Sequence, residues 1–232
     1  MKIKKINNKP INFDDFASNY KNHISNSFGY IDNDVSYYHS AKAKIAKNEL
    51  DYTPKKILDF GCGVGLMINF LIQNFKDSDF FAYDDSQKSL EYVKAKYPEV
   101  NCVNNLDIKE KFDLIFVSNV IHHVKSTERN DLFKKIHNLL TFDGHLLIYE
   151  HNPYNPITLK LVANCAFDAD AELIKKKDLI KICNLNNLKL KKSGYIHFFP
   201  SKLKFFFNIE KYFKWFFLGA QYFCIFKKNT KT

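Results

Sequence analysis

Arginine is almost absent from this chain of 232 residues: of its 35 lysine and arginine residues, Arg129 alone is an arginine. Arginine supplies the planar fork that grips phosphate and reads guanine, so its scarcity weighs against a nucleic-acid-binding protein. The chain also lacks an apolar run of the roughly 18 residues that a membrane span needs. Its first residues, MKIKKINNKP, are charged with no apolar segment behind them, so no signal peptide is expected and the predicted location is cytoplasmic.

Cysteines are few and scattered, at positions 62, 102, 165, 183 and 224. No two of them form a C-x-x-C pair. This odd, dispersed set predicts reduced thiols in a cytoplasm and argues against a zinc site.

Charge is distributed unevenly along the chain, whose formal net charge is +10. Residues 175–232 hold 14 lysines and two acidic residues, whereas residues 1–174 carry nearly balanced charges. A basic end favours an anionic partner, although a general drift of composition toward lysine produces the same pattern.

The stretch from 55 to 75, KKILDFGCGVGLMINFLIQNF, predicts a ligand-binding turn. A short apolar run is followed by glycines at alternate positions, Gly61, Gly63 and Gly65, and then by apolar residues at helical spacing. Residues without a Cβ let the backbone bend sharply and let a ligand lie against it, and the next helix begins with unpaired N–H groups. Leu66 stands where the third glycine of the dinucleotide fingerprint would fall, which disfavours NAD.

Strands and helices alternate around this turn, which predicts a parallel sheet with helices on both faces. The expected strands are 57–60, 79–83, 100–104, 112–117, 145–149, 188–199 and 221–227. The expected helices are 13–20, 35–50, 66–75, 86–97, 130–140, 157–165 and 177–185. Asp143 and Gly144 are expected to form the turn before the fifth strand. The whole chain, 1–232, is predicted to be one domain: a lid (1–50), a ligand-binding core (51–152), and an insertion with closing strands (153–232).

Polar residues follow the expected strand ends, where ligands bind in open parallel sheets. They are Asp59, Asp84, Asp85, Asn104, Asn105, Ser118, Asn119, Glu150, His151 and Asn152. Asp84 comes about 20 residues after the glycine turn, where an acid can accept both hydroxyls of a ribose.

The segment DFGCGVG at 59–65 resembles motif I of the class I methyltransferases that use S-adenosylmethionine. The F-D-x-x-A-x-x-Y pattern at 13–20 resembles the leader of many small-molecule members, and the two late strands resemble the pair that closes their sheet. The resemblance implies a Rossmann-like α/β fold with a seven-stranded, mostly parallel sheet. It also implies a late antiparallel strand, helices on both faces and an N-terminal helical lid.

The resemblance further implies which residues hold the cofactor. Asp59 would hold its amino group, Asp84 its ribose, and Asn119 would lie under its methionine end. Asp85 either lies beside the adenosine or caps the next helix with Ser86. The full implied set is Tyr20, Asp59, Gly61, Cys62, Gly63, Asp84, Asp85, Asn105, Leu106 and Asn119.

Two histidines are the candidates for catalysis. His123 lies in the V-x-H-H pattern of 119–124, near the expected acceptor entrance, and His151 stands where a base would take a proton from an acceptor hydroxyl. Both also have a structural explanation, as packing or turn-forming residues. Adjacent His122 and His123 cannot face one point on a helix, so no metal is predicted.

The implied activity is methyl transfer from S-adenosylmethionine, with S-adenosylhomocysteine as product, to oxygen of a small-molecule or lipid/glycan-linked acceptor. The lipid-linked alternative rests on a similarity of HNPYNP (151–156) and the tail to bacterial methyltransferases of unassigned substrate. The tail segment 202–223 combines aromatic and basic residues, and either meets a membrane peripherally or packs as a lid with solvated lysines. An RNA methyltransferase and a non-catalytic cofactor-binding subunit are the alternatives.

Overall fold

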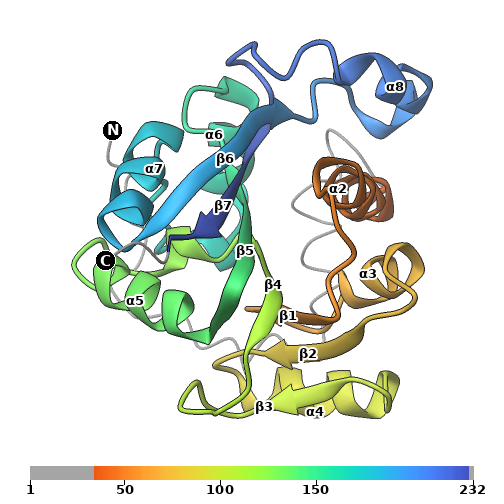
Figure 1. Cartoon of the computed structure of the whole chain (residues 1–232). Coiled ribbons are helices and arrows are strands. Elements are labelled where there is room, and N and C mark those ends of the chain that lie inside the picture. The colour runs from red at the N-terminus through yellow and green to blue at the C-terminus, as the bar shows by residue number, and fades with distance from the viewer. Residues whose placement is uncertain (1–33, 230–232) are drawn as a thin grey trace.

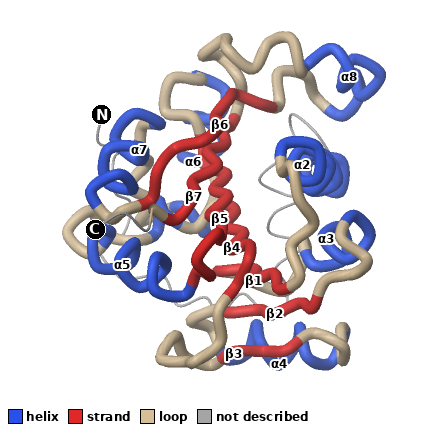
Figure 2. Tube along the Cα trace, viewed as in Figure 1, coloured by secondary structure: helices blue, strands red, loops and turns tan. Residues whose placement is uncertain are grey.

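The computed structural model describes residues 34–229, which form one seven-stranded sheet with helices on both faces (Figures 1 and 2). The strand order is β3-β2-β1-β4-β5-β7-β6. Strands from β3 to β5 pair in parallel, and β7 runs antiparallel to both neighbours. The strands are β1 (Lys56–Phe60), β2 (Asp79–Tyr83), β3 (Asn101–Val103), β4 (Phe112–Ser118), β5 (Leu140–His151), β6 (Leu188–Ile196) and β7 (Gln221–Lys228). The predicted mostly parallel sheet with one late antiparallel strand is confirmed.

The helices follow the apolar patterns of the sequence, and three of those described begin after a residue whose side chain caps them. They are α2 (Val35–Glu49), α3 (Ile68–Asn74), α4 (Gln87–Lys96), α5 (Arg129–Leu139), α6 (Pro156–Asn164), α7 (Lys176–Leu185) and α8 (Phe207–Glu210). Ser86 caps α4 by accepting from the Ser89 N–H at 3.1 Å. Asn155 caps α6 by accepting from the Thr158 N–H at 2.9 Å. Each cap satisfies a donor that the first helical turn leaves open.

Alternation along the strands divides the apolar residues into two cores. Ile57 belongs to the core under α2, α3 and α4, and its neighbour Leu58 to the core under α5 and α7. Phe75 fills the first core and Phe133 the second, and both are fully buried. Since side chains alternate between the faces of a strand, Asp59 points to the same face as Ile57. A charged residue therefore enters the first face of the sheet, beneath α2.

The turn predicted at Asp143 and Gly144 is wrong, because β5 already begins at Leu140 and continues through both residues. The pairing with β4 shifts register between Phe112 and Leu114. A Cβ at Gly144 would lie 2.9 Å from the Phe112 carbonyl oxygen. Glycine therefore serves a close approach of two strands here, and its usual association with turns misled the prediction.

Two other regions bear on the sequence predictions. The expected helix at 13–20, with Tyr20, lies outside the described residues. The helix expected over 35–50 is α2, which buries Ala43 and Ala46 against the domain. In residues 34–229 no helix has the length and apolar character to cross a membrane.

Candidate functional site

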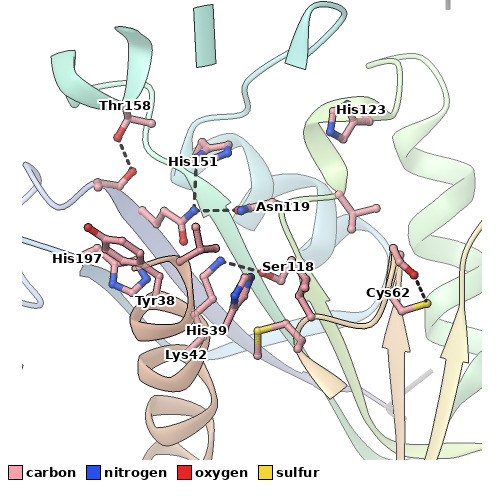
Figure 3. Close-up of a pocket in the computed structure, with 18 of the residues that line it drawn as sticks. Tyr38, His39, Lys42, Cys62, Ser118, Asn119, His123, His151, Thr158 and His197 are labelled. Carbon is pink, nitrogen blue, oxygen red and sulfur yellow. Dashed lines mark hydrogen bonds between the residues drawn. The ribbon is translucent and has the colours of Figure 1, made fainter. Parts of the chain in front are cut away.

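A cavity of about 470 Å³ opens at the carboxyl ends of β1 and β4, where the strand order reverses. This is the position at which open α/β sheets bind ligands. Its wall comes from α2, the glycine turn, the end of β4, α6 and the segment 197–200 (Figure 3). The volume lies in the range of small-molecule and cofactor pockets, about 300–1,000 Å³.

The glycine turn forms the floor of this cavity. Gly61, Gly63 and Gly65 have φ values of 72°, 50° and 73°, a region that residues with side chains rarely adopt. A Cβ at Gly61 would lie 2.4 Å from a methyl carbon of Val120. The turn is tied to the end of β2, because the Gly61 N–H donates to the Tyr83 carbonyl at 2.8 Å. Glycine is therefore required here by conformation and by space.

Asp84 joins the glycine turn to the start of α4. Its Oδ2 accepts from the Gly63 N–H at 2.8 Å, and its Oδ1 accepts from the Ser86 N–H at 3.0 Å. Asp85 accepts from the Tyr83 hydroxyl at 2.5 Å, and Ser86, not Asp85, caps α4. Because Ser86 supplies the cap, the alternative role of Asp85 as the helix cap is wrong. Both aspartates line the cavity.

Asp59 carries a buried carboxyl oxygen that lacks a partner. The residue is 4% exposed, and its Oδ2 has no hydrogen-bond partner among the described residues. Burial, with Asp84 nearby, raises the pKa of Asp59 to about 7. An unpartnered buried carboxylate is costly, so a site that leaves one facing a cavity is suited to a cationic donor group.

The ends of β4 and β7 meet on the other side of the cavity. The Gln221 side-chain amide donates to Asn119 Oδ1 at 3.1 Å and lies 3.4 Å from His151 Nδ1 (Figure 3). Asn119 has a φ of 59°, a left-handed conformation that asparagine tolerates better than most residues. The oxygen Oε1 of Gln221 and both ring nitrogens of His197 are buried without a partner in the described part of the chain. Three residues with orphaned polar atoms, Asp59, His197 and Gln221, thus line one cavity.

Nitrogen bases line the acceptor side of this cavity, and burial disfavours their charged forms. Lys42 is 2% exposed and donates to the Ser118 hydroxyl at 2.9 Å. Burial lowers the pKa of Lys42 to about 7, although Glu150 opposes that shift. Burial also lowers the pKa of His39 to about 3 and of His151 to about 4, with Lys42 and His122 respectively adding to the effect. At neutral pH the two histidines are therefore uncharged, and Lys42 is poised between its two forms.

A buried carboxylate, Glu150, fixes the turn after β4. It accepts from the Val120 and Ile121 N–H groups at 3.0 and 2.7 Å, and from His122 Nδ1 at 2.6 Å. Burial alone would lower the pKa of His122, but Glu150 and Asp168 raise it to about 10. Burial would raise the pKa of Glu150, but His122 lowers it to about 2. The pair is therefore ionised at neutral pH, inside the protein.

The structure brings most of the predicted site residues together. Those that line the cavity are Asp59, Gly61, Cys62, Gly63, Asp84, Asp85, Asn119, His123 and His151. Asn105 and Leu106 lie outside its lining. Asn105 accepts from the Asp107 N–H on the surface, and Leu106 packs on the second core.

Sequence reasoning missed Lys42, His39, His197 and Gln221, which also line the cavity. The sequence does contain an indication that Lys42 is buried. It follows Tyr38 by four residues and precedes Ala46 by four, so it lies on the buried stripe of α2. A lysine within such a stripe is seldom buried unless it is functional or paired. His197 carried no such signal, because it follows the end of β6 in a segment without a helical pattern.

Residues 58–146 match the family model described as a methyltransferase domain. Among curated proteins, the chain is 31% identical to (S)-coclaurine N-methyltransferase of Papaver somniferum over 106 residues, 42% of this chain and 29% of that protein. It is 26% identical to malonyl-[acyl-carrier protein] O-methyltransferase of Acetivibrio thermocellus over 152 residues, 60% of this chain and 52% of that protein. The chain thus spans less than a third of the first of these relatives and about half of the second.

Among solved structures, magnesium protoporphyrin IX methyltransferase from Synechocystis with bound S-adenosylmethionine matches with a TM-score of 0.62. The match covers 96% of this chain and 100% of that one at 15% identity. At this identity the likeness shows the fold. The predicted Rossmann-like class I methyltransferase fold is confirmed, and the predicted methyltransferase class is confirmed for the domain at 58–146.

The Glu150→Gln substitution should lower the free energy of unfolding by about 3–5 kcal/mol, because it removes the nearer of the two carboxylates that pair with the buried His122 imidazolium. The pKa of Glu150 is lowered in the fold, so its contribution is lost as pH falls below about 4.5. The pKa of His122 is raised, so its contribution is lost as pH rises above about 6.5. Urea unfolding should therefore show the largest difference from wild type between these values.

The matched control is Glu99→Gln, an exposed acid after α4. It should change the unfolding free energy by less than about 0.5 kcal/mol at every pH. A loss in Glu150→Gln no larger than in this control would show that Glu150 does not hold the turn.

Proposed function

We propose, from the match of residues 58–146 to a methyltransferase domain, that the protein uses S-adenosylmethionine to methylate an oxygen atom of a small-molecule or lipid-linked acceptor. One observation carries this proposal. A single cavity holds the glycine turn and the unpartnered Asp59 oxygen on one side and uncharged nitrogen bases on the other. That arrangement suits a cationic donor molecule next to an acceptor that must lose a proton.

The residues present fit S-adenosylmethionine. Asp59 would accept from its amino group, Asp84 would accept from its ribose hydroxyls, and Gly61 and Gly63 would line its methionine part. The bound cofactor of the Synechocystis structure supports this assignment. When bound, the sulfonium supplies an activated methyl group, and the protein's task is to align the acceptor with it. Such alignment contributes up to about 7–11 kcal/mol.

Lys42 and His151 are the two groups placed to receive the proton of an acceptor hydroxyl. Both line the cavity; Lys42 is buried and His151 is partly buried. A general base works best when its pKa lies near the working pH. The pKa of about 7 therefore favours Lys42 over His151, whose pKa of about 4 makes it a weak base at neutral pH. His151 then serves to hold the acceptor through a hydrogen bond.

The affinity for S-adenosylhomocysteine should rise between pH 5.5 and 7, because the amino group of the ligand pairs with the ionised form of Asp59 and burial raises the pKa of that acid to about 7. Below its pKa the expected rise approaches about tenfold per pH unit. Asp59→Asn should weaken binding about 10-fold to 100-fold and remove the pH dependence, as measured by calorimetry.

Asp77→Asn, at an exposed acid, is the control and should bind like wild type. Titration with S-adenosylmethionine and NAD completes the test. Binding of NAD without binding of the other two ligands would overturn the cofactor assignment.

Lys42→Met should lower kcat by about 10²–10⁴-fold on any acceptor that the wild type methylates, because it removes the proton acceptor while keeping an unbranched side chain that ends one atom earlier. The wild-type kcat should rise with pH through about 7, and the variant should lose this rise. The measurement uses labelled S-adenosylmethionine with a panel of phenols, alcohols and carboxylic acids.

His151→Gln is the comparison for Lys42→Met. Loss of the pH rise in His151→Gln, with the rise intact in Lys42→Met, would assign the base to His151. Tight cofactor binding without turnover on the whole panel, with turnover restored by a second protein, would favour a non-catalytic subunit.

The tail supports an acceptor or partner of lipid character. The segment is not one amphipathic helix, because it forms a 3₁₀ turn at Ser201–Phe206, then α8, then turns. Phe205 and Trp215 are 66% and 77% exposed. The further exposed large apolar side chains of this segment are Leu203, Ile209, Tyr212, Phe213, Phe217 and Leu218, and Lys202, Lys204 and Lys211 are exposed among them. An apolar patch with lysines suits the surface of an anionic membrane.

This patch is continuous with the cavity wall. Phe198, Phe199 and Pro200 line the cavity, and the tail segment follows them directly. Buried Glu210 of α8 accepts from the Phe198 and Phe199 N–H groups at 3.0 and 3.2 Å. An acceptor held in a membrane would therefore reach the cavity from the side on which the patch lies.

The protein should sediment with vesicles that contain phosphatidylglycerol and less with vesicles of phosphatidylcholine alone, because lysines add attraction to apolar insertion. The double substitution Phe205→Ser, Trp215→Ser should weaken this binding at least tenfold. Phe142→Ser, which changes a side chain 70% exposed near the opposite end of β5, should leave it unchanged. Equal loss in the control, or no binding by wild type, would show that the patch does not meet membranes.

A further inference from the structure

Three side chains outside the cofactor side of the cavity converge on one point. His122 and His123 lie on the 3₁₀ turn Ile121–His123, and Asp168 lies on the 3₁₀ turn Ala166–Asp168. Ligand atoms of the three residues all lie within 4.8 Å of one another. Adjacent histidines on an α-helix would diverge, but here Nε2 of each approaches Oδ1 of Asp168, at 3.3 Å from His122 and 3.5 Å from His123. The reason given above for expecting no metal at these histidines therefore does not hold.

The two separations from Asp168 Oδ1 match the edges of a metal coordination shell. Zinc bonds nitrogen and carboxylate oxygen at about 2.0–2.2 Å in a tetrahedral arrangement, which places neighbouring ligand atoms about 3.3–3.6 Å apart. A hydrogen bond between nitrogen and a carboxylate oxygen is shorter, about 2.7–2.9 Å when it is charge-assisted. The contact of His122 Nδ1 with Glu150, at 2.6 Å, has that short length, and the two contacts to Asp168 do not.

A second observation concerns the other nitrogen of each ring. His122 Nδ1 faces Glu150 at 2.6 Å, and His123 Nδ1 faces Asp170 at 3.4 Å. Metal-bound histidines generally donate their second ring nitrogen to a carboxylate or carbonyl group, which fixes the ring and leaves the first nitrogen free to ligate. Both histidines have a carboxylate at Nδ1 and turn Nε2 toward Asp168.

We propose that His122, His123 and Asp168 bind a divalent transition-metal ion, with zinc the best match to two imidazoles and one carboxylate. Three protein ligands leave a coordination position open, as in zinc sites that bind water or substrate. His123 also lines the cavity, so the ion would lie at its wall (Figure 3). The proposal concerns binding of the ion and does not depend on the proposed methyl transfer.

The test is titration of the chelator-treated full chain with Co²⁺ and Zn²⁺. One equivalent of Co²⁺ should give visible absorption of a tetrahedral or five-coordinate site, without the near-ultraviolet band of a thiolate ligand, and Zn²⁺ should displace it. Asp168→Asn and His123→Gln should each weaken binding at least tenfold. Each should also abolish the rise in melting temperature that Zn²⁺ produces in wild type.

Asp131→Asn and His137→Gln, both on α5, are the matched controls and should bind the ion like wild type. Circular dichroism of Asp168→Asn and His123→Gln without metal separates loss of the site from loss of the fold. Wild-type binding no tighter than that of these two variants would overturn the proposal, and would leave the cluster as an imidazolium held between carboxylates. A thiolate band would also overturn it, because it would move the ion to a cysteine.

Discussion

The buried carboxylate of Glu150 is the constraint on which the acceptor side of the cavity depends. Its two oxygens hold the backbone of Val120 and Ile121 and the ring of His122, and so they fix the turn that follows β4. The His122 carbonyl in turn accepts from the Glu172 N–H at 2.7 Å, which ties the insertion after β5 to the same turn. Because a buried ion pair is costly unless its hydrogen bonds are complete, this geometry permits little adjustment. The glycine turn and the acceptor wall thereby meet at fixed positions.

The two sides of the cavity carry different kinds of ionisable group. The donor side keeps acids, Asp59 and Asp84, while the acceptor side keeps nitrogen bases that burial holds in uncharged forms. A cationic molecule on the donor side would relieve the raised pKa of Asp59, and it would further disfavour a proton on Lys42. Binding on one side would therefore prepare the chemistry on the other through Coulomb interaction alone.

The sequence predicted the parts of the site that lie close together along the chain. The glycine turn and the aspartate after β2 were found because strand, turn and helix follow each other in a short pattern, and the Gly63–Asp84 contact joins them. The order and type of the strands were predicted equally well, although β5 begins earlier, at Leu140, and the strand expected over 188–199 ends at Ile196. The sequence did not predict the contact of Asp168 with His122, because the two residues are 46 positions apart and no periodic pattern links them. Lys42 escaped because burial of a lysine depends on tertiary packing.

Glu210 connects the tail to the wall of the cavity. It accepts from three successive backbone N–H groups, those of His197, Phe198 and Phe199, and it belongs to α8 rather than to the sheet. The cavity wall formed by these three residues is thus held by α8 as well as by β6. Directly after β6, His197 adopts a φ of 60°. The same three residues border the cavity, so the position of α8 and the shape of this wall are set by one carboxylate. A ligand that contacts the exposed aromatic side chains around α8 would therefore lie one hydrogen-bonded step from the cavity.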